Sequence, residues 1–154
     1  MKQLFYTTKY AFTLLLVYLS LSVSAQKFYN VSDDHLAIQG YDPVAYFTDH
    51  SASEGKKEFS YSVDGVTYRF TSQQHLLAFK AEPDKYKPQY GGWCAYAMGA
   101  TGEKVDVDPE TFKLINGKLY LFYNRFFNNT KKAWDKDEAN LKQKADANWQ
   151  KIAN

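Results

Sequence analysis

Alternating apolar and polar positions predict two β-hairpins in this chain. The first alternation runs over residues 58–71 around a central Asp64-Gly65 turn, and its apolar residues share one face that we expect to be buried. The second flanks Asn116-Gly117, the strongest two-residue hairpin signal, and comprises Phe112–Ile115 and Lys118–Tyr123. A brief apolar stretch at 36–38 is predicted as a short strand that enters a turn.

Three further segments are predicted to be helical. Ser72 stands in the N-cap position of a helix that Pro83 stops or redirects. Residues 93–98 are apolar enough for one or two helical turns. Near the C terminus, apolar residues at helical spacing predict one face of a helix or helix pair: Trp134, Leu141, Ala145, Trp149 and Ile152. The predicted fold class is therefore α+β, with a small antiparallel sheet built from two hairpins, packed with short helices and a C-terminal amphipathic helix.

The first 25 residues have the pattern of a signal peptide. Lys2 and Lys9 precede an apolar run from Ala11 to Val23, and Val23-Ser24-Ala25 offers a small-residue cleavage site. The run is shorter than the roughly 20 residues of a membrane-spanning helix, although an uncleaved anchor is the alternative. We expect an exported protein, periplasmic or extracellular, without a stable membrane anchor after signal cleavage.

The mature chain, residues 26–154, has the size of one domain with a C-terminal helical extension. The whole sequence has 19 basic and 17 acidic residues, and two of the basic residues, Lys2 and Lys9, belong to the signal peptide. The mature part is therefore formally neutral, which gives no electrostatic reason to expect nucleic acid as a partner. Its lone cysteine, Cys94, cannot form an intramolecular disulfide, so stability must come from an aromatic-rich core.

Soft ligands suggest a copper site. Cys94 and Met98 are four residues apart and would share a helix face, and two sulfurs with the imidazole of His75 would suit Cu(I) better than zinc. The alternatives are structural: Cys94 as a small buried hydrophobic residue, and His75 as the partner of a local backbone or tyrosine group.

Two other kinds of site are open. A thiol-dependent enzyme would use Cys94 with His75 as its base, but the nucleophile elbow, the phosphate-binding loop and the Cys-x-x-Cys motif are all missing, which favours a protein that is not an enzyme. Asp106, Asp108 and Glu110 could bind a hard cation or start a helical turn. A pocket for haem or an aromatic metabolite has four candidate rings, which could equally be core: Tyr41, Tyr68, Tyr90 and Trp93.

Four motifs between Gly40 and Met98 resemble the YHS domain, in its exported single-domain form. They are Gly-Tyr-Asp-Pro-Val-Ala-Tyr-Phe at 40–47, the Tyr68, Ser72, His75 and Phe79 series, Glu-Pro-Asp-Lys-Tyr at 82–86, and Gln-Tyr-Gly-Gly-Trp-Cys-Ala-Tyr-Ala-Met at 89–98. The resemblance covers about 36–125, with a YHS core at about 36–90.

The resemblance implies an α+β scaffold and a binding module. In related YHS modules, metal is bound by cysteines in a DPVCG-like turn and a YFCS-like strand end, and this chain has Ala45 and Thr71 at those positions. The metal ligands therefore do not carry over. We expect an exported YHS-type binding module whose partner is a small ligand or an envelope protein, with a copper or redox-related accessory role as one version and a thiol enzyme or a haem-binding protein as alternatives.

Overall fold

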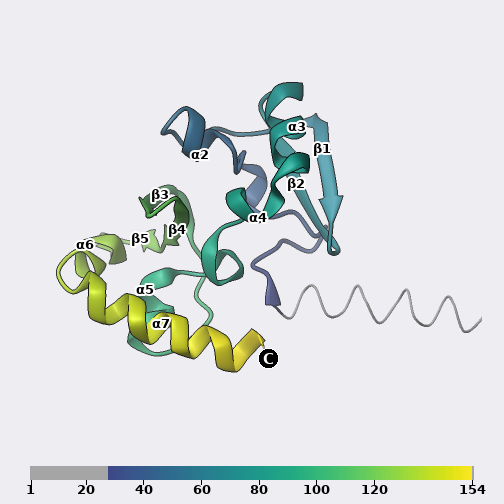
Figure 1. Cartoon of the computed structure of the whole chain (residues 1–154). Helices are drawn as coiled ribbons and strands as arrows, with labels where there is room; N and C mark the ends of the chain where they lie inside the picture. Colours follow the sequence, from purple (N-terminus) through teal and green to yellow (C-terminus); the bar gives the residue numbers. More distant parts are fainter. Residues whose placement is uncertain (1–27, 154) are drawn as a thin grey trace, which may run out of the picture.

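The computed structural model describes residues 28–153 (Figure 1). The predicted signal peptide, residues 1–25, lies outside the described residues. Within 28–153, every helix is too short or too polar to cross a bilayer.

The first half of the chain places one hairpin among short helices (Figure 1). Its elements are η1 (Ile38–Gly40), α2 (Ala45–Thr48), β1 (Lys56–Val63), β2 (Val66–Phe70), α3 (Gln73–Ala81) and α4 (Pro83–Tyr86). The second half contains two hairpins and the longest helix, and its elements are η2 (Gln89–Gly92), α5 (Ala95–Ala100), β3 (Asp108–Ile115), β4 (Lys118–Phe122), β5 (Asn124–Arg125), β6 (Asn128–Asn129), α6 (Thr130–Trp134) and α7 (Glu138–Ala153).

The predicted α+β class is confirmed, and both predicted hairpins form around their predicted turns. Val63 pairs with Val66 across Asp64-Gly65, and Ile115 pairs with Lys118 across Asn116-Gly117. The two hairpins do not join into one sheet: β1-β2, β3-β4 and a third hairpin, β5-β6, are separate two-stranded antiparallel sheets. The sequence patterns specify pairing within a hairpin, whereas pairing between hairpins depends on tertiary packing.

The start and end of α3 follow the predicted local signals. Ser72 is the N-cap, and its Oγ accepts a hydrogen bond from the backbone N–H of His75 at 3.2 Å. Pro83 occupies the first turn of α4, where its missing N–H is not needed, so α3 ends at Ala81. The predicted strand at 36–38 is wrong in detail, because Leu36 forms only an isolated bridge with Thr67 and Ile38 begins the 3-10 turn η1.

Aromatic rings fill a core that consists of two clusters. In the first, the Phe79 ring of α3 lies 4.7 Å from the Tyr68 ring and 5.2 Å from the Phe70 ring of β2, measured between centroids. In the second, Trp134 packs on the buried rings of β4. Tyr96 of α5 packs against both clusters and so connects them.

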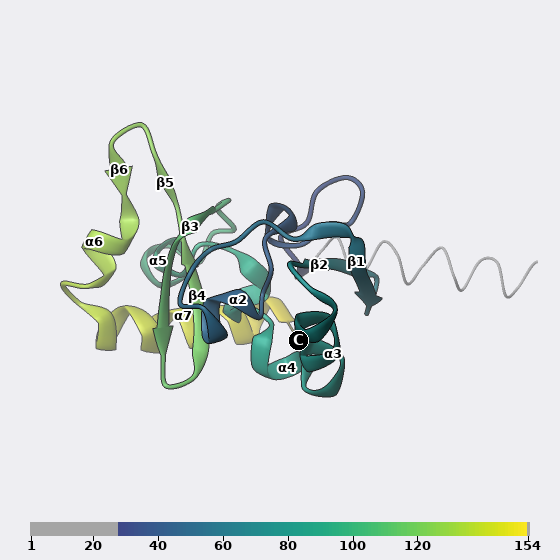
Figure 2. The same cartoon turned by 90° about the horizontal axis from the view of Figure 1, so that it is seen from above.

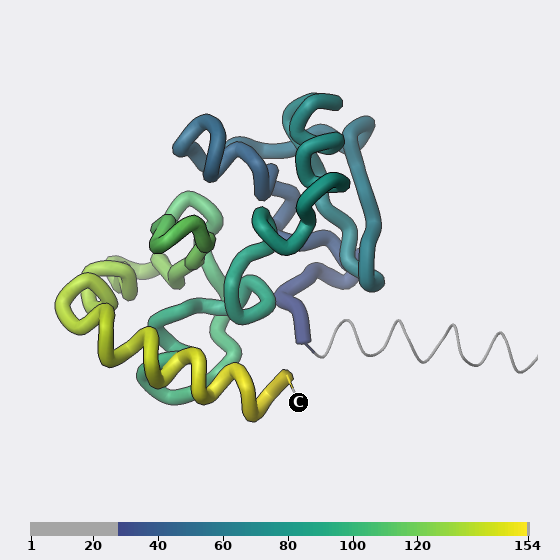
Figure 3. The backbone as a smooth tube through the Cα atoms, viewed as in Figure 1, coloured from purple at the N-terminus to yellow at the C-terminus, as the bar shows by residue number. Residues whose placement is uncertain are grey.

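The C-terminal helix α7 covers the second cluster, as its apolar spacing predicts. Figure 3 shows α7 running along one side of the molecule, and α5 packs closely against it. Leu141 and Ala145 of α7 are buried in this contact. Gly99 permits it, since a Cβ atom there would lie 2.4 Å from the carbonyl oxygen of Leu141.

Candidate functional site

A buried carboxylate organises the region where the first motifs meet. The side chain of Asp42 is fully buried, and its Oδ1 accepts the backbone N–H of Val44 at 2.8 Å. Its Oδ2 accepts both the backbone N–H and the hydroxyl of Thr71, each at 2.8 Å. Hydrogen bonds of this kind replace the ones that a carboxylate makes with water, and so they offset the free-energy cost of burying its charge. Asp42 therefore joins the turn before α2 to the end of β2.

The same carboxylate orients His75. Nδ1 of His75 lies 2.7 Å from Oδ2 of Asp42, and the imidazole is 14 % exposed. The carboxylate is an acceptor, so Nδ1 donates the proton and Nε2 becomes the acceptor of the neutral ring. Nε2 lies 3.4 Å from the hydroxyl of Thr48 at the end of α2. An imidazole held in this way is suited to proton transfer or to metal ligation through Nε2.

Cys94 lies in a different environment. Its thiol is fully buried in the first core cluster, and Sγ accepts the backbone N–H of Tyr123 at 3.3 Å and lies 3.5 Å from the hydroxyl of Thr130. None of these partners is shared with His75, whose ring contacts are Asp42, Thr71 and Thr48. The structural alternative for Cys94, a small buried hydrophobic residue, matches its burial.

Met98 belongs to the second core cluster, although it lies one helical turn after Cys94. Its side chain is fully buried there, and its backbone carbonyl accepts a hydrogen bond from the Asn148 side chain. Among residues 28–153, no three His, Cys, Asp or Glu side chains gather as a metal site would require. The contacts described for Cys94, Met98 and His75 do not bring them together, and a Cu(I) site at these residues stays a prediction.

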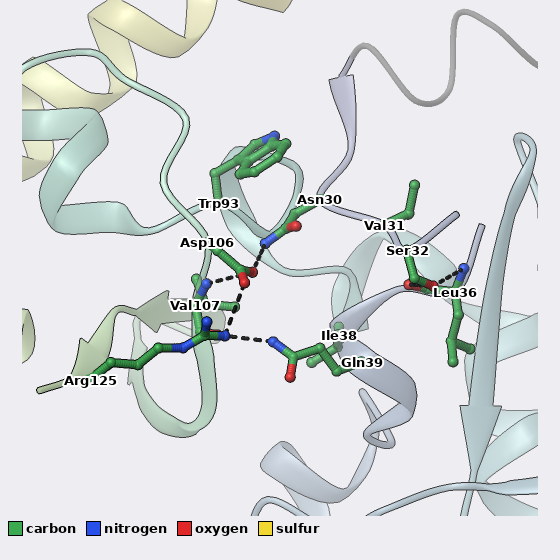
Figure 4. A pocket seen from close by; sticks show the side chains of 10 residues that line it. All are labelled: Asn30, Val31, Ser32, Leu36, Ile38, Gln39, Trp93, Asp106, Val107 and Arg125. Carbon is green, nitrogen blue, oxygen red and sulfur yellow. Dashed lines mark hydrogen bonds and ion pairs between the residues drawn. The ribbon is translucent and has the colours of Figure 1, made fainter. Parts of the chain in front are cut away.

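A pocket of about 450 Å³ lies between the N-terminal segment and the second half of the chain (Figure 4). We call it the Trp93 pocket. Its apolar lining comprises Val31, Leu36, Ile38, Val107 and the indole of Trp93, and its polar lining comprises Asn30, Ser32, Gln39, Asp106 and Arg125. Ligand pockets in proteins combine an apolar wall with a few placed polar groups in the same way.

An ion pair lies at the polar side of the Trp93 pocket. Nη2 of Arg125 lies 3.0 Å from Oδ2 of Asp106, and both side chains are about half exposed. Oδ1 of Asp106 also accepts the side-chain N–H of Asn30 at 3.1 Å and the backbone N–H of Val107 at 2.8 Å. Asp106 is thus held in place, whereas the guanidinium, with its five N–H donors, can take a second anion.

The four predicted pocket rings lie at different places. Trp93 lines the Trp93 pocket, and its Nε1 donates to the carbonyl of Phe28 at 3.0 Å. Tyr90 lines a second pocket of about 420 Å³, and burial together with its hydrogen bond to Asp146 raises the pKa of its hydroxyl. Tyr68 is core, and burial raises its pKa. Tyr41 donates to Glu110, and burial with the nearby Glu110 charge raises its pKa.

The predicted carboxylate cluster does not act as a unit. Asp106 bonds Arg125, Glu110 bonds Tyr41, and Asp108 accepts from Thr111 and Asn124. The predicted helical turn at this point is wrong, because Asp108 begins β3. Sequence reasoning missed Asp42 and Arg125 as site residues, since each acts through partners that are distant in the chain.

Comparisons with protein families, with curated proteins and with solved structures found no match to this chain.

Proposed function

We propose that this protein is a non-enzymatic binding module that holds a small organic molecule in the Trp93 pocket. The ligand would combine an apolar, flat part with an anionic group. One observation carries the proposal. A single pocket of about 450 Å³ combines an apolar lining, which includes the indole of Trp93, with the guanidinium of Arg125. This volume lies within the range of small-molecule sites.

The chemistry of the lining favours an anionic ligand. Arg125 is half exposed, so an incoming carboxylate or sulfonate can reach the guanidinium without opening the core. Asp106 keeps its bonds to Asn30 and Val107 while the anion binds, so it remains stabilised. A bond between an anion and a guanidinium is charge-assisted and stronger than one between neutral groups.

We further propose that the module is of the YHS type and is exported. The YHS part of the proposal is supported by the α+β fold and by the contact of Asp42 with Thr71 and His75. Asp42 belongs to the motif at 40–47, whereas Thr71 and His75 lie within the series from Tyr68 to Phe79. The export part rests on the sequence pattern of residues 1–25.

The thiol-enzyme alternative has less support. A nucleophilic thiolate needs access to its substrate and a nearby base. Cys94 is fully buried, and its sulfur accepts a backbone N–H, while His75 is bonded to Asp42. Metal binding remains a second candidate, because the Asp42–His75 pair has the carboxylate–imidazole arrangement common among metal-ligating histidines.

The proposal can be tested with anilinonaphthalene sulfonate, a fluorescent probe with flat apolar rings and an anionic group. We expect saturable binding by the mature chain. The double change Arg125→Gln with Asp106→Asn removes the cation without leaving a lone carboxylate, and it should weaken binding about tenfold or more, the loss of one charge-assisted bond. Val31→Trp, which narrows the Trp93 pocket, should weaken binding similarly.

Two controls locate the bound probe. Lys132→Gln removes an exposed cation outside the Trp93 pocket. Phe126→Asn with Phe127→Gly removes two exposed rings that could attract the probe without a pocket. Both controls should retain the wild-type affinity. A wild-type chain that does not bind the probe, or pocket variants that bind it like wild type, would contradict the proposal.

A further inference from the structure

Within residues 28–153, three hairpins have two-residue turns with the same left-handed backbone. In the first, φ is 54° at Asp64 and 75° at Gly65, and in the second it is 51° at Asn116 and 71° at Gly117. These Asp-Gly and Asn-Gly turns have the residues that this conformation favours. In the third hairpin, β5-β6, the turn residues are Phe126 and Phe127, with φ of 52° and 65°.

Two phenylalanines are unfavourable in such a turn. A bulky side chain at positive φ costs about 1 to 2 kcal/mol relative to the usual backbone conformation. Burial does not compensate here, because Phe126 is 90 % exposed and Phe127 is fully exposed. The stability of the β5-β6 hairpin therefore does not explain why two phenylalanines occupy its turn. Backbone strain at positive φ is often found at functional sites.

The hairpin presents these rings as a projecting tip. Figure 2 shows β5 and β6 extending away from the body of the molecule, with the turn at the far end. Arg125 and Asn128 pair directly beside the turn, and Asn124 and Asn129 form the next pair. The apolar surface is thus narrow and is bordered by polar side chains, one of which is the cation of Arg125.

The sequence around this tip is basic. Residues 111–134 contain no acidic side chain and five basic ones, which are Lys113, Lys118, Arg125, Lys131 and Lys132. Lys118 lies at the β3-β4 turn and lines the second pocket, so it does not belong to the tip. Three of these cations pair with carboxylates outside the segment: Lys113 with Asp135 and Glu138, Arg125 with Asp106, and Lys131 with Asp135. Lys132 lies on the exposed side of α6, soon after the hairpin.

We propose that Phe126 and Phe127 insert into an anionic lipid surface, as the contact point of a reversible peripheral attachment. A lipid interface accepts a narrow apolar tip without a complementary shape, and the exposed cation of Lys132 near the tip is attracted to anionic headgroups. A protein partner fits less well. A stable protein interface takes about 800 Å² from each side, whereas two phenylalanine rings supply about 300 to 500 Å².

The inference is independent of the small-ligand proposal. The Trp93 pocket uses Arg125, whereas the two turn residues do not line it. Changes at Phe126 and Phe127 therefore test the lipid contact without removing a residue that lines the Trp93 pocket.

The test uses the chain's own favoured turn. Phe126→Asn with Phe127→Gly gives the third hairpin the same turn residues as the second hairpin, an asparagine followed by a glycine. We expect the mature protein to co-sediment with vesicles of phosphatidylcholine and phosphatidylglycerol, and the double variant to bind them at least about tenfold more weakly. Its thermal unfolding midpoint should be unchanged or higher, because the strain is relieved. Unfolding therefore cannot explain a loss of vesicle binding.

Matched variants sharpen the result. Leu77→Ser removes an exposed apolar side chain of α3, away from the tip, and should leave vesicle binding unchanged. Lys132→Gln should weaken binding to vesicles with phosphatidylglycerol but not to those of phosphatidylcholine alone. Vesicle binding that is absent in wild type, or equal in the double variant, would overturn the proposal. Self-association of wild type that the double variant loses, without vesicle binding, would show instead that the rings contact a second copy of the chain.

Discussion

Nδ1 of His75 lies 2.7 Å from Oδ2 of Asp42, although 33 positions of sequence separate the two residues. The carboxylate also accepts the backbone N–H of Val44 and two hydrogen bonds from Thr71. It therefore joins the turn before α2, the end of β2 and the first turn of α3. This relationship makes Asp42 the polar centre of the region that carries the first sequence motifs.

Replacing Asp42 should destabilise the fold strongly. Asp42→Ala leaves the N–H groups of Val44 and Thr71 and the imidazole of His75 without their acceptor, and we expect a loss of about 3 kcal/mol in the free energy of unfolding. Urea denaturation followed by circular dichroism measures it. Asp49→Ala, an exposed aspartate beyond the end of α2, is the matched control and should change stability by less than about 0.5 kcal/mol. Equal effects of the two changes would contradict the assigned role.

Gly99 should not tolerate alanine, although alanine is the better helix former. A Cβ atom at this position of α5 would lie 2.4 Å from the carbonyl oxygen of Leu141, which is backbone and cannot rotate away. We expect Gly99→Ala to destabilise the protein by about 1 to 3 kcal/mol as α5 and α7 move apart. Thermal unfolding checks this. An unchanged or raised midpoint would show that the helices do not pack as closely as described.

Lys113 connects the second hairpin to the C-terminal helices. Its Nζ lies 2.7 Å from Oδ1 of Asp135 and 2.5 Å from Oε2 of Glu138. The hydrogen bond from Lys113, followed by that from Lys131, lowers the pKa of Asp135 below its ordinary value of 3.8. The groups are about one-third exposed, so we expect Lys113→Met to remove only about 0.5 to 1 kcal/mol at neutral pH.

The pH dependence of that loss has a definite sign. A carboxyl with a lowered pKa in the folded state stabilises the protein above its unfolded pKa, and the stabilisation disappears as pH falls through the lower folded value. The difference in stability between wild type and Lys113→Met should therefore be present at pH 6 and shrink as pH falls below 3.8, the ordinary pKa of Asp135. Denaturation curves at several pH values measure it, and a difference that grows in acid would contradict the ion pair.

Cys94 should be unreactive in the folded protein. The thiol is fully buried, and Sγ accepts the backbone N–H of Tyr123, so an alkylating reagent must wait for the structure to open. We expect iodoacetamide to label Cys94 slowly in buffer and rapidly in denaturant, as followed by mass spectrometry. Fast labelling in buffer that rises with pH through a depressed pKa would instead restore the thiol-enzyme alternative.

The copper prediction has its own test. If Cys94, Met98 and His75 hold Cu(I), then Cys94→Ser and His75→Gln should each weaken its binding under a competing chelator, since each removes a ligand. Met98→Leu, which keeps the volume of a buried side chain, should weaken it as well. If all three variants bind Cu(I) as tightly as wild type, these residues do not form a copper site, and the organic ligand is the favoured partner.

The local elements follow from the amino-acid sequence alone. The two hairpins around Asp64-Gly65 and Asn116-Gly117, the cap at Ser72 and the buried face of α7 all follow from neighbouring residues. Turn chemistry, capping and helical periodicity act over a few positions, so a linear pattern contains them.

Contacts between residues that are distant in the chain could be seen only in the folded structure. The fold brought Asp42 to His75, placed the Cys94 and Met98 side chains in separate core clusters, and made Arg125 and Trp93 part of the lining of one pocket. It also formed the β5-β6 hairpin, whose Phe126-Phe127 turn contains none of the residues by which such turns are recognised. These features depend on contacts between distant segments. The packing of the whole chain selects among the possible contacts, and no short pattern of residues encodes that packing.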